Sequence, residues 1–291
     1  MKKPRTFGKW AMVLIAAAFA VYFLLPTALT VTNSFMTESE INANYGAVFS
    51  VTSGGYISDT VHLKFIPEKV TMQQYFTGLI RSPDYLVKFW NSMLYVVPIV
   101  VFQLVVASTA SYSFMRWQGR IRKGIFFLYI ILMLMPYQVT LVPNYLVSKW
   151  FGILNTRKAI ILPGVFAPFS VFLLTRFMRR IPYELIEAAK LDGANEWQIF
   201  TKIVLPQCTG PLVSVAILVF IDYWNMVEQP LILLSDSEMY PLSVFLSYIN
   251  STEVGIAFAM ATVYMIPPLL LFLWGEEYLV EGIASSGSVK G

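Results

Sequence analysis

Residues 184–206 read ELIEAAKLDGANEWQIFTKIVLP and form the longest charged, amphipathic interval in the second half of a mostly apolar chain. Pro182, just before it, suits the first turn of a helix. Leu185, Ala188 and Ala189 follow at i, i+3 and i+4, which predicts one apolar face of small residues. The first part of the interval therefore predicts a short amphipathic helix.

The second part of the interval predicts a turn and a second helix. Asp192–Gly193 is a turn signal, and Asn195 is suited to cap the helix that follows. Apolar residues then recur at i, i+3 and i+7, namely Trp197, Phe200 and Val204. We expect Pro206 to end this helix. Residues 182–206 would thus form a helix–turn–helix elbow, although periodicity alone fits an interfacial helix that rests on lipid equally well.

Composition indicates a polytopic membrane protein. Hydrophobic residues make up 57% of the 291 residues and charged residues only 13%, which leaves too little polar surface for a soluble chain of this length. The net charge of +4 is better explained by cytoplasmic loops than by nucleic-acid binding. One cysteine, Cys208, and one histidine, His62, exclude an intramolecular disulfide and a His/Cys metal cluster, so we expect no metal site.

Hydropathy predicts six membrane spans with both termini in the cytoplasm. The parts are a cytoplasmic N-terminus at 1–9, a first span at 10–32, an extracytoplasmic loop at 33–88, a permease core at 89–281 and a cytoplasmic tail at 282–291. Within the core, the further spans are expected at 89–114, 124–147, 159–177, 211–234 and 256–274. The first apolar run is longer than a signal-peptide core, so we interpret it as an uncleaved span. Basic residues before it and at 116–123 favour this orientation.

The loop at 33–88 is polar and mixed. Residues 36–60 have the composition of an irregular segment, and the alternation at 61–65 permits a short strand. On the inner side, Gly119 and Gly124 have the spacing of a phosphate-binding loop, but Ile125 and Phe126 replace the required Lys-Ser/Thr. The chain is therefore expected to have no ATP site of its own.

The predicted fifth span carries a group of polar and aromatic residues in its outer half, namely Asp222, Tyr223, Trp224, Asn225 and Glu228. At helical spacing, Asn225, Glu228 and either Ile221 or Asp222 share a face. Ionisable groups at this depth normally face protein or water. They would either hydrogen-bond between helices or form a wall that binds sugar hydroxyls and stacks on sugar rings.

The elbow resembles the EAA loop of bacterial ABC importer permeases, through Glu187–Ala189, Asp192–Ala194 and Leu205–Pro206. The longer string EAAKLDGANEWQIFTKIVLP looks most like permeases of carbohydrate importers. The resemblance implies an all-α, type I importer permease whose coupling helix docks on an ATPase. The implied coupling residues are Glu187, Ala188, Ala189, Leu191, Asp192, Gly193 and Ala194. Glu187 would cap or salt-bridge within the loop, the two alanines would permit close docking, and Gly193 would allow the turn.

The resemblance also implies the partners. These would be a second homologous permease, two ATPase subunits that bind ATP and Mg²⁺, and an extracytoplasmic solute-binding protein. This chain would hold no cofactor, catalyse no covalent chemistry and form half of a sugar pathway, for oligosaccharides in particular, in a bacterial cytoplasmic membrane.

Three alternatives stay open at the level of sequence. The first is a secondary transporter driven by an ion gradient, with Asp222 and Glu228 as cation carriers. The second is a scaffold in which these acids only join helices. The third is an ABC permease for a solute other than sugar.

Overall fold

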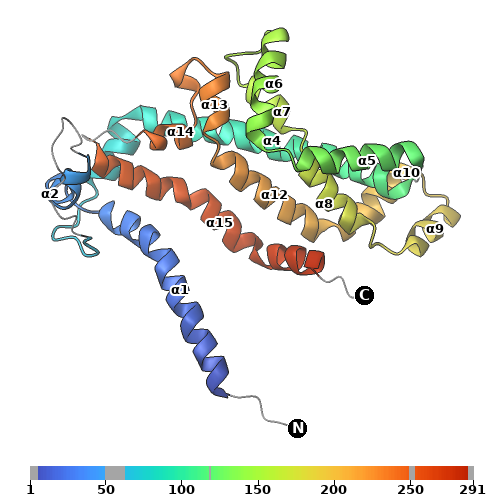
Figure 1. Ribbon diagram of the computed structural model, residues 1–291, viewed down its shortest axis with the longest axis horizontal. Helices are drawn as coiled ribbons and strands as arrows, with labels where there is room; N and C mark the ends of the chain where they lie inside the picture. The colour runs from blue at the N-terminus through green and yellow to red at the C-terminus, as the bar shows by residue number, and fades with distance from the viewer. Residues whose placement is uncertain (1–5, 50–62, 118, 249–252, 288–291) are drawn as a thin grey trace. The chain divides into compact units, whose positions relative to one another are not determined.

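The computed structural model describes residues 6–49, 63–117, 119–248 and 253–287, and within these ranges the regular elements are all helical (Figure 1). The chain forms two compact units. The first comprises Met1–Val87 and Phe245–Ile266, and the second comprises Lys88–Val244 and Pro267–Gly291. The elements in chain order are α1 (Thr6–Asn33), α2 (Glu38–Phe49), α3 (Gln73–Phe76), the π-helical η1 (Thr77–Arg81), α4 (Pro83–Arg116), α5 (Arg120–Met133), α6 (Tyr137–Trp150), α7 (Lys158–Gly164), α8 (Pro168–Met178), α9 (Tyr183–Leu191), α10 (Glu196–Ile199), the π-helical η2 (Phe200–Val204), α11 (Leu205–Gln207), α12 (Thr209–Trp224), α13 (Glu228–Leu233), the 3₁₀ turn η3 (Ser237–Met239), α14 (Leu242–Ser247) and α15 (Val254–Gly287).

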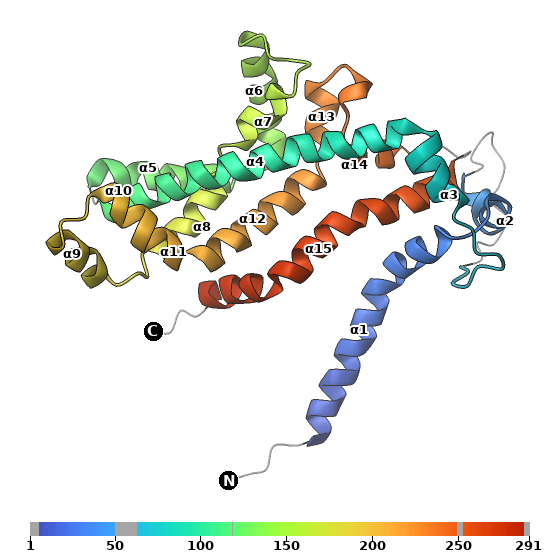
Figure 2. The ribbon, with the colours of Figure 1, turned by 180° about the vertical axis from the view of Figure 1, so that it is seen from behind.

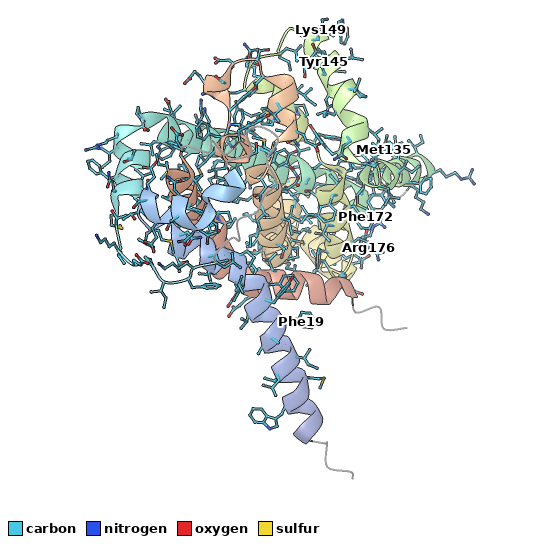
Figure 3. All side chains as sticks on the ribbon, turned by 60° about the vertical axis from the view of Figure 1, so that its left-hand side comes forward. Phe19, Met135, Tyr145, Lys149, Phe172 and Arg176 are labelled. Atoms are coloured by element: carbon cyan, nitrogen blue, oxygen red, sulfur yellow. The ribbon has the colours of Figure 1, made fainter. Side chains whose placement is uncertain are left out.

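Among the described residues, four helical segments are long and apolar enough to cross a membrane. They are Met12–Asn33, Pro83–Arg116, Lys158–Met178 and Val254–Leu279. The count rises to six if each of two bent helix pairs is one span. These pairs are Arg120–Met133 with Tyr137–Trp150, and Glu196–Gln207 with Thr209–Trp224. The expected all-α polytopic architecture is confirmed. The apolar side chains of α1, such as Phe19, are largely exposed, as suits a helix in lipid (Figure 3).

The third span is broken at Pro136, as its prolines predict, but not at Pro143, which lies inside α6; the fifth span is also interrupted. α5 and α6 meet at 106° around Leu134–Pro136, because Pro136 cannot continue the backbone ladder of α5 and disfavours a helical conformation in the residue before it. The predicted fifth span at 211–234 is wrong as a continuous helix. α12 ends at Trp224, and α13 begins only at Glu228.

The first unit corrects the expectation of an irregular segment at 36–60. α2 occupies Glu38–Phe49, and Ile41 and Tyr45 bury one face, at i and i+4, against Met36 and Val254. Tertiary packing thus stabilises a helix that composition alone does not favour. A short strand was considered possible at 61–65, but residues 63–65 form none. The other two residues, including His62, lie outside the described residues.

The second unit has its own core, in which α5 and α12 both pack on α8 (Figure 2). Two buried hydrogen bonds join α4 to α8: Gln103 Nε2 donates to Ser170 Oγ at 2.6 Å, and Ser111 Oγ donates to the Val171 carbonyl at 2.9 Å. Gly164 of α7 lies so close to Ile99 of α4 that an added Cβ would be 3.0 Å from the Ile99 side chain. Small and polar residues therefore set close helix approach here, as is typical of membrane bundles.

Candidate coupling elbow and substrate cavity

The turn of the elbow forms as its sequence predicts. Gly193 has φ +80°, a left-handed conformation that glycine adopts without steric cost. It allows Ala194 N–H to donate to the Ala189 carbonyl at 2.9 Å, which closes the end of α9. Asn195 Oδ1 accepts from Gln198 N–H, and Gln198 Oε1 accepts from Asn195 N–H, both at 2.9 Å, in a complete capping box.

The second helix of the elbow continues past the predicted end at Pro206. It passes through the π-helical turn Phe200–Val204 and ends only after Gln207. Pro206 has no N–H, and in an α-helix its ring would collide with the carbonyl of Lys202. The wider turn directly before Pro206 accommodates that ring, and Gln207 Nε2 donates to the Ile203 carbonyl at 3.0 Å.

Only one of the two alanines predicted to permit close docking, Ala188, is exposed. Ile186 and Ala189 are buried, whereas Leu185 and Ala188 are exposed. Hydrophobic residues of the elbow and of the neighbouring spans form one cluster: Tyr112, Met178, Ile186, Ala189, Ile199, Phe200, Val204 and Cys208. The elbow is therefore anchored on the ends of α4 and α8 and runs directly into α12.

A polar network fixes the elbow to α4. Arg116 Nη2 donates to Glu196 Oε1 at 2.9 Å, and Arg116 Nε lies 3.1 Å from Oε2. Tyr112 Oη donates to Glu196 Oε2 at 2.6 Å, and Lys190 Nζ lies 3.4 Å from Oε1. Arg116 Nη1 also donates to Tyr183 Oη at 3.2 Å. One guanidinium at the end of a span thus contacts both helices of the elbow.

The network holds the Glu196 carboxylate ionised. Burial acts to raise the pKa of Glu196, but the hydrogen bonds from Arg116 and Tyr112 outweigh it and lower the pKa to about 2. Glu187, which was predicted to cap or salt-bridge within the loop, is exposed and forms no ion pair in the part of the chain that the structure describes. The ion-pairing role belongs to Glu196 instead.

The outer surface of α9 is an exposed ridge, which we define as Glu187, Ala188 and Leu191, and Trp197 is exposed on the helix that follows. The exposed fractions are 90% for Leu191 and 67% for Trp197. Among the seven predicted coupling residues, Glu187, Ala188, Leu191, Asp192 and Gly193 are exposed, Ala194 is half-buried and Ala189 is buried. An exposed apolar ridge on a rigidly anchored turn is suited to dock in a groove of another protein.

A cavity of about 530 Å³ lies among α6, α7, α8, α12 and α13. Its lining includes residues next to three helix breaks: Met135 between α5 and α6, Ala167 between α7 and α8, and Gln229 just after the break between α12 and α13. Irregular backbone at membrane depth is tolerated where it borders protein or a water-filled space. The polar side chains of the lining are Tyr137, Thr140, Asn144, Asp222, Tyr223 and Gln229.

Only two of the five residues predicted to contact substrate line the cavity. Asp222 and Tyr223 line it, whereas Trp224 is buried against Phe220 and Phe89, with ring centroids 5.3 and 5.7 Å away. Asn225 Nδ2 donates to the Ile221 carbonyl of its own helix at 2.8 Å.

Glu228 is exposed and lies 3.4 Å from Gln138 Nε2. The predicted shared face of Asn225, Glu228 and either Ile221 or Asp222 is wrong, because the helix breaks between Trp224 and Glu228.

Residues of α4 and of the α6–α7 connection hold the loop after α13 in place. Asn91 Nδ2 donates to the Glu238 carbonyl at 2.7 Å, and Tyr95 Oη donates to the Met239 carbonyl at 2.9 Å. Asn155 Oδ1 accepts from Ser235 N–H at 2.9 Å. These contacts fix the loop after α13 to α4 and to the α6–α7 connection.

The bent spans, the anchored elbow and the cavity between the helices define a multi-pass membrane transport subunit. Residues 76–285 match the family described as binding-protein-dependent transport system inner membrane component. The chain therefore belongs to this family of ABC importer permeases.

Curated relatives and a solved structure agree with this assignment. The arabinooligosaccharides transport system permease protein AraQ of Halalkalibacterium halodurans is 27% identical over 295 residues, which cover 100% of this chain and 99% of AraQ. The melibiose/raffinose/stachyose import permease protein MelC of Bacillus subtilis is 31% identical over 209 residues, 70% of this chain and 75% of MelC. The fold is also similar to a chain in the crystal structure of a bacterial ABC transporter involved in the import of the acidic polysaccharide alginate, with a TM-score of 0.77 at 22% identity over 96% of this chain and 99% of that chain.

Proposed function

We propose that this chain forms one half of the translocation pathway of a sugar importer and that its elbow receives the force of a partner ATPase. The partners would be a second homologous permease, two ATPase subunits that bind ATP and Mg²⁺, and an extracytoplasmic binding protein. Both termini would lie in the cytoplasm, with 1–9 and 282–291 inside, 33–88 outside and the permease core at 89–281. Family membership favours this function over an ion-gradient-driven carrier that uses Asp222 and Glu228.

The observation that carries the coupling role is the combination of an exposed outer ridge with an anchored inner face. Leu191 is 90% exposed on the ridge, whereas Ile186 and Ala189 are buried on the opposite side of the same helix. An elbow that only rested on lipid would not need the Arg116–Glu196 ion pair, which joins the elbow to α4. A rigid joint of this kind transmits displacement of the ridge to α4, α8 and α12.

The polar side chains of the cavity are suited to bind sugars. Its polar lining contains two tyrosines, an asparagine, a glutamine, a threonine and a single carboxylate. These groups donate and accept hydrogen bonds to hydroxyls, and tyrosine rings stack on the C–H faces of sugars. The names of the relatives AraQ and MelC, which refer to arabinooligosaccharides and to melibiose, raffinose and stachyose, support the same class of solute. Asp222 and Tyr223 would contact the sugar.

The test is sugar-stimulated ATPase activity of the complete transporter in nanodiscs, with Gly193→Asp compared with wild type. Gly152→Asp is the matched control, because Gly152 also has positive φ, +66°, and an added Cβ at either glycine would meet nothing within 4 Å. Both variants carry a similar backbone strain of about 1 kcal/mol. We expect Gly193→Asp to lose stimulation and Gly152→Asp to keep it.

Two results would contradict the proposal. If Gly193→Asp is stimulated as strongly as wild type, the elbow does not transmit coupling. If Gly193→Asp loses stimulation but Gly152→Asp loses it equally, the effect is general destabilisation and the coupling role is not supported.

A further inference from the structure

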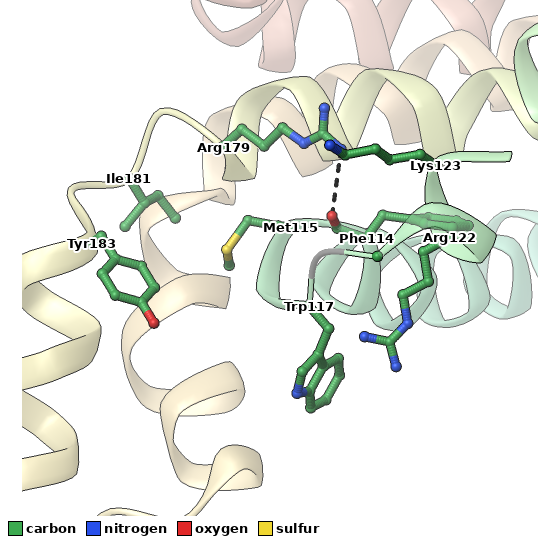
Figure 4. A pocket seen from close by; sticks show the side chains of 9 residues that line it. Phe114, Met115, Trp117, Arg122, Lys123, Arg179, Ile181 and Tyr183 are labelled. Carbon is green, nitrogen blue, oxygen red and sulfur yellow. Dashed lines mark hydrogen bonds between the residues drawn. The ribbon is translucent and has the colours of Figure 1, made fainter. Parts of the chain in front are cut away.

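A second cavity, of about 370 Å³, opens between the α4–α5 and α8–α9 connections, beside the elbow (Figure 4). Its lining residues are Phe114, Met115, Trp117, Gly119, Arg122, Lys123, Arg179, Ile181 and Tyr183. The proposed function makes no use of this cavity. Gly119, one of the two glycines with the spacing of a phosphate-binding loop, lines this cavity. The loop is not expected to bind ATP, because the required Lys-Ser/Thr is absent.

The cavity is strongly cationic. Arg122, Lys123 and Arg179 line it, and no carboxylate is among its lining residues. None of these three cations forms an ion pair within the described residues; the ion pairs nearest in the chain use Arg116 and Lys190. The cavity therefore concentrates positive charge without an internal counter-ion.

Neighbouring groups hold two of the cations in place. The Arg122 guanidinium lies 5.0 Å from the centre of the Trp117 ring, and the Arg179 guanidinium lies 4.9 Å from that of Phe126. Arg179 Nη2 also lies 3.4 Å from the Phe114 carbonyl, as the dashed line in Figure 4 marks. Gly119 is the N-cap of α5, a helix of 14 residues, so the free amides of its first turn add positive potential at the cavity.

The surroundings indicate that an anion in this cavity would be attached to an apolar molecule. Ile121, Ile125 and Leu128 recur on α5 at i, i+4 and i+7, and their side chains are exposed by 80%, 43% and 51%. Trp117, at the cavity, is 39% exposed and is the kind of side chain that lies at membrane interfaces. Basic pockets at the cytoplasmic ends of spans, with apolar surface alongside, fit phospholipid head groups.

We propose that this cavity binds the phosphodiester of an anionic membrane lipid. Arg122, Lys123 and Arg179 would surround the phosphate, and the acyl chains would lie along the exposed stripe of α5. Since the cavity borders Tyr183 at the start of α9, a bound lipid would contact the elbow and the ends of α4 and α8 at once.

The experiment is native mass spectrometry of the purified full-length chain with dioleoylphosphatidylglycerol, dioleoylphosphatidylcholine or inorganic phosphate as the probe. The cavity variant carries Arg122→Gln, Lys123→Gln and Arg179→Gln. The control variant removes the same charge elsewhere, with Arg120→Gln, Arg176→Gln and Lys202→Gln. We expect phosphatidylglycerol to bind the wild type more tightly than phosphatidylcholine, and the cavity variant to lose about a hundredfold in its first phosphatidylglycerol affinity. The control variant should retain at least ten times more affinity than the cavity variant.

Other results would overturn the proposal. Equal loss in the two variants would mean non-specific attraction, and inorganic phosphate that competes with phosphatidylglycerol at equal concentration would mean a site for soluble anions. The charge-retaining variant with Arg122→Lys and Arg179→Lys guards against misfolding, since it should keep most of the affinity. Its complete loss of binding, in a chain with wild-type helicity, would also refute a site based on charge.

Discussion

Replacing Glu196 by glutamine removes the carboxylate that joins the elbow to α4. The side chain of Arg116 is only 8% exposed, whereas that of Glu196 is 37% exposed, so water screens part of the interaction. Hydrogen bonds to a charged group contribute about 1.5–3 kcal/mol each when protected from water. Allowing for the exposure, we expect Glu196→Gln to destabilise the docked elbow by about 2 kcal/mol, which is roughly a thirtyfold change in its opening equilibrium.

Amide hydrogen exchange of the full-length chain in nanodiscs measures this opening directly. Amides of α9 should exchange roughly thirty times faster in Glu196→Gln, because local opening of the elbow exposes them. Amides of α2, in the other unit, should not change. Glu184→Gln is the matched control, since Glu184 is an exposed acid of the same elbow and forms no ion pair within the described residues.

A double-mutant cycle with Arg116→Gln separates the pair from general damage. If Arg116 and Glu196 act through each other, the double variant should be little worse than either single variant. The reasoning is refuted if Glu196→Gln leaves exchange of α9 at the wild-type rate, or if the effects of the two single variants simply add.

Three further outcomes follow from the structure. Because the folded-state pKa of Glu196 is about 2, below its ordinary value of 4.5, its stabilisation of the elbow is complete above about pH 4.5 and is lost as pH falls toward 2; the protection factors of the α9 amides, which correct for the intrinsic pH dependence of exchange, should fall across that window in wild type and not in Glu196→Gln. Gly275→Ala should lower the Tm of the chain in detergent by the equivalent of about 1–3 kcal/mol, because the new Cβ would collide with Ile217 Cδ1, and Ile217→Val should restore most of it. Tyr137→Phe, in the cavity, should raise the KM for sugar uptake severalfold with Tyr22→Phe of α1 as control; an unchanged KM would remove Tyr137 from the sugar path.

Sequence predicted the parts of the site whose causes are local. The Asp192–Gly193 turn and the Asn195 cap depend on backbone conformation and on partners three residues away, so their signals lie within the motif itself. Ala189 was wrongly placed on the exposed docking surface, because Leu185 and Ile186 are equally apolar and only the position of α4 and α8 decides which side of α9 is buried. Glu196 and Arg116 are 80 residues apart in the chain, and no local pattern joins them.

The same difference between local and long-range causes explains which residues of the cavity were predicted. Asp222 and Tyr223 were predicted from their polarity within an apolar run, which is a local signal. Pro230 is the local signal for the break between Trp224 and Glu228, because in a continuous helix its ring would collide with the Met226 carbonyl; this signal was overlooked, so the continuous helix and its shared polar face were wrong. Tyr137 and Gln229 were missed because they reach the cavity only through the bend of α5 against α6 and through that break.

α12 connects the elbow to the cavity. It begins at Thr209, directly after the buried Cys208 of the elbow cluster, and carries Asp222 and Tyr223 near its other end. Its 16 residues span about 24 Å as one uninterrupted helix. Ser214 Oγ donates to the Tyr278 carbonyl of α15 at 2.7 Å, so the helix is also held laterally. The backbone is bent by 75° just before α12 begins at Thr209, and the helix is broken again after Trp224, so both interruptions lie at the ends of α12. Displacement of the elbow ridge would therefore move Asp222 and Tyr223 as a unit instead of dissipating along the span.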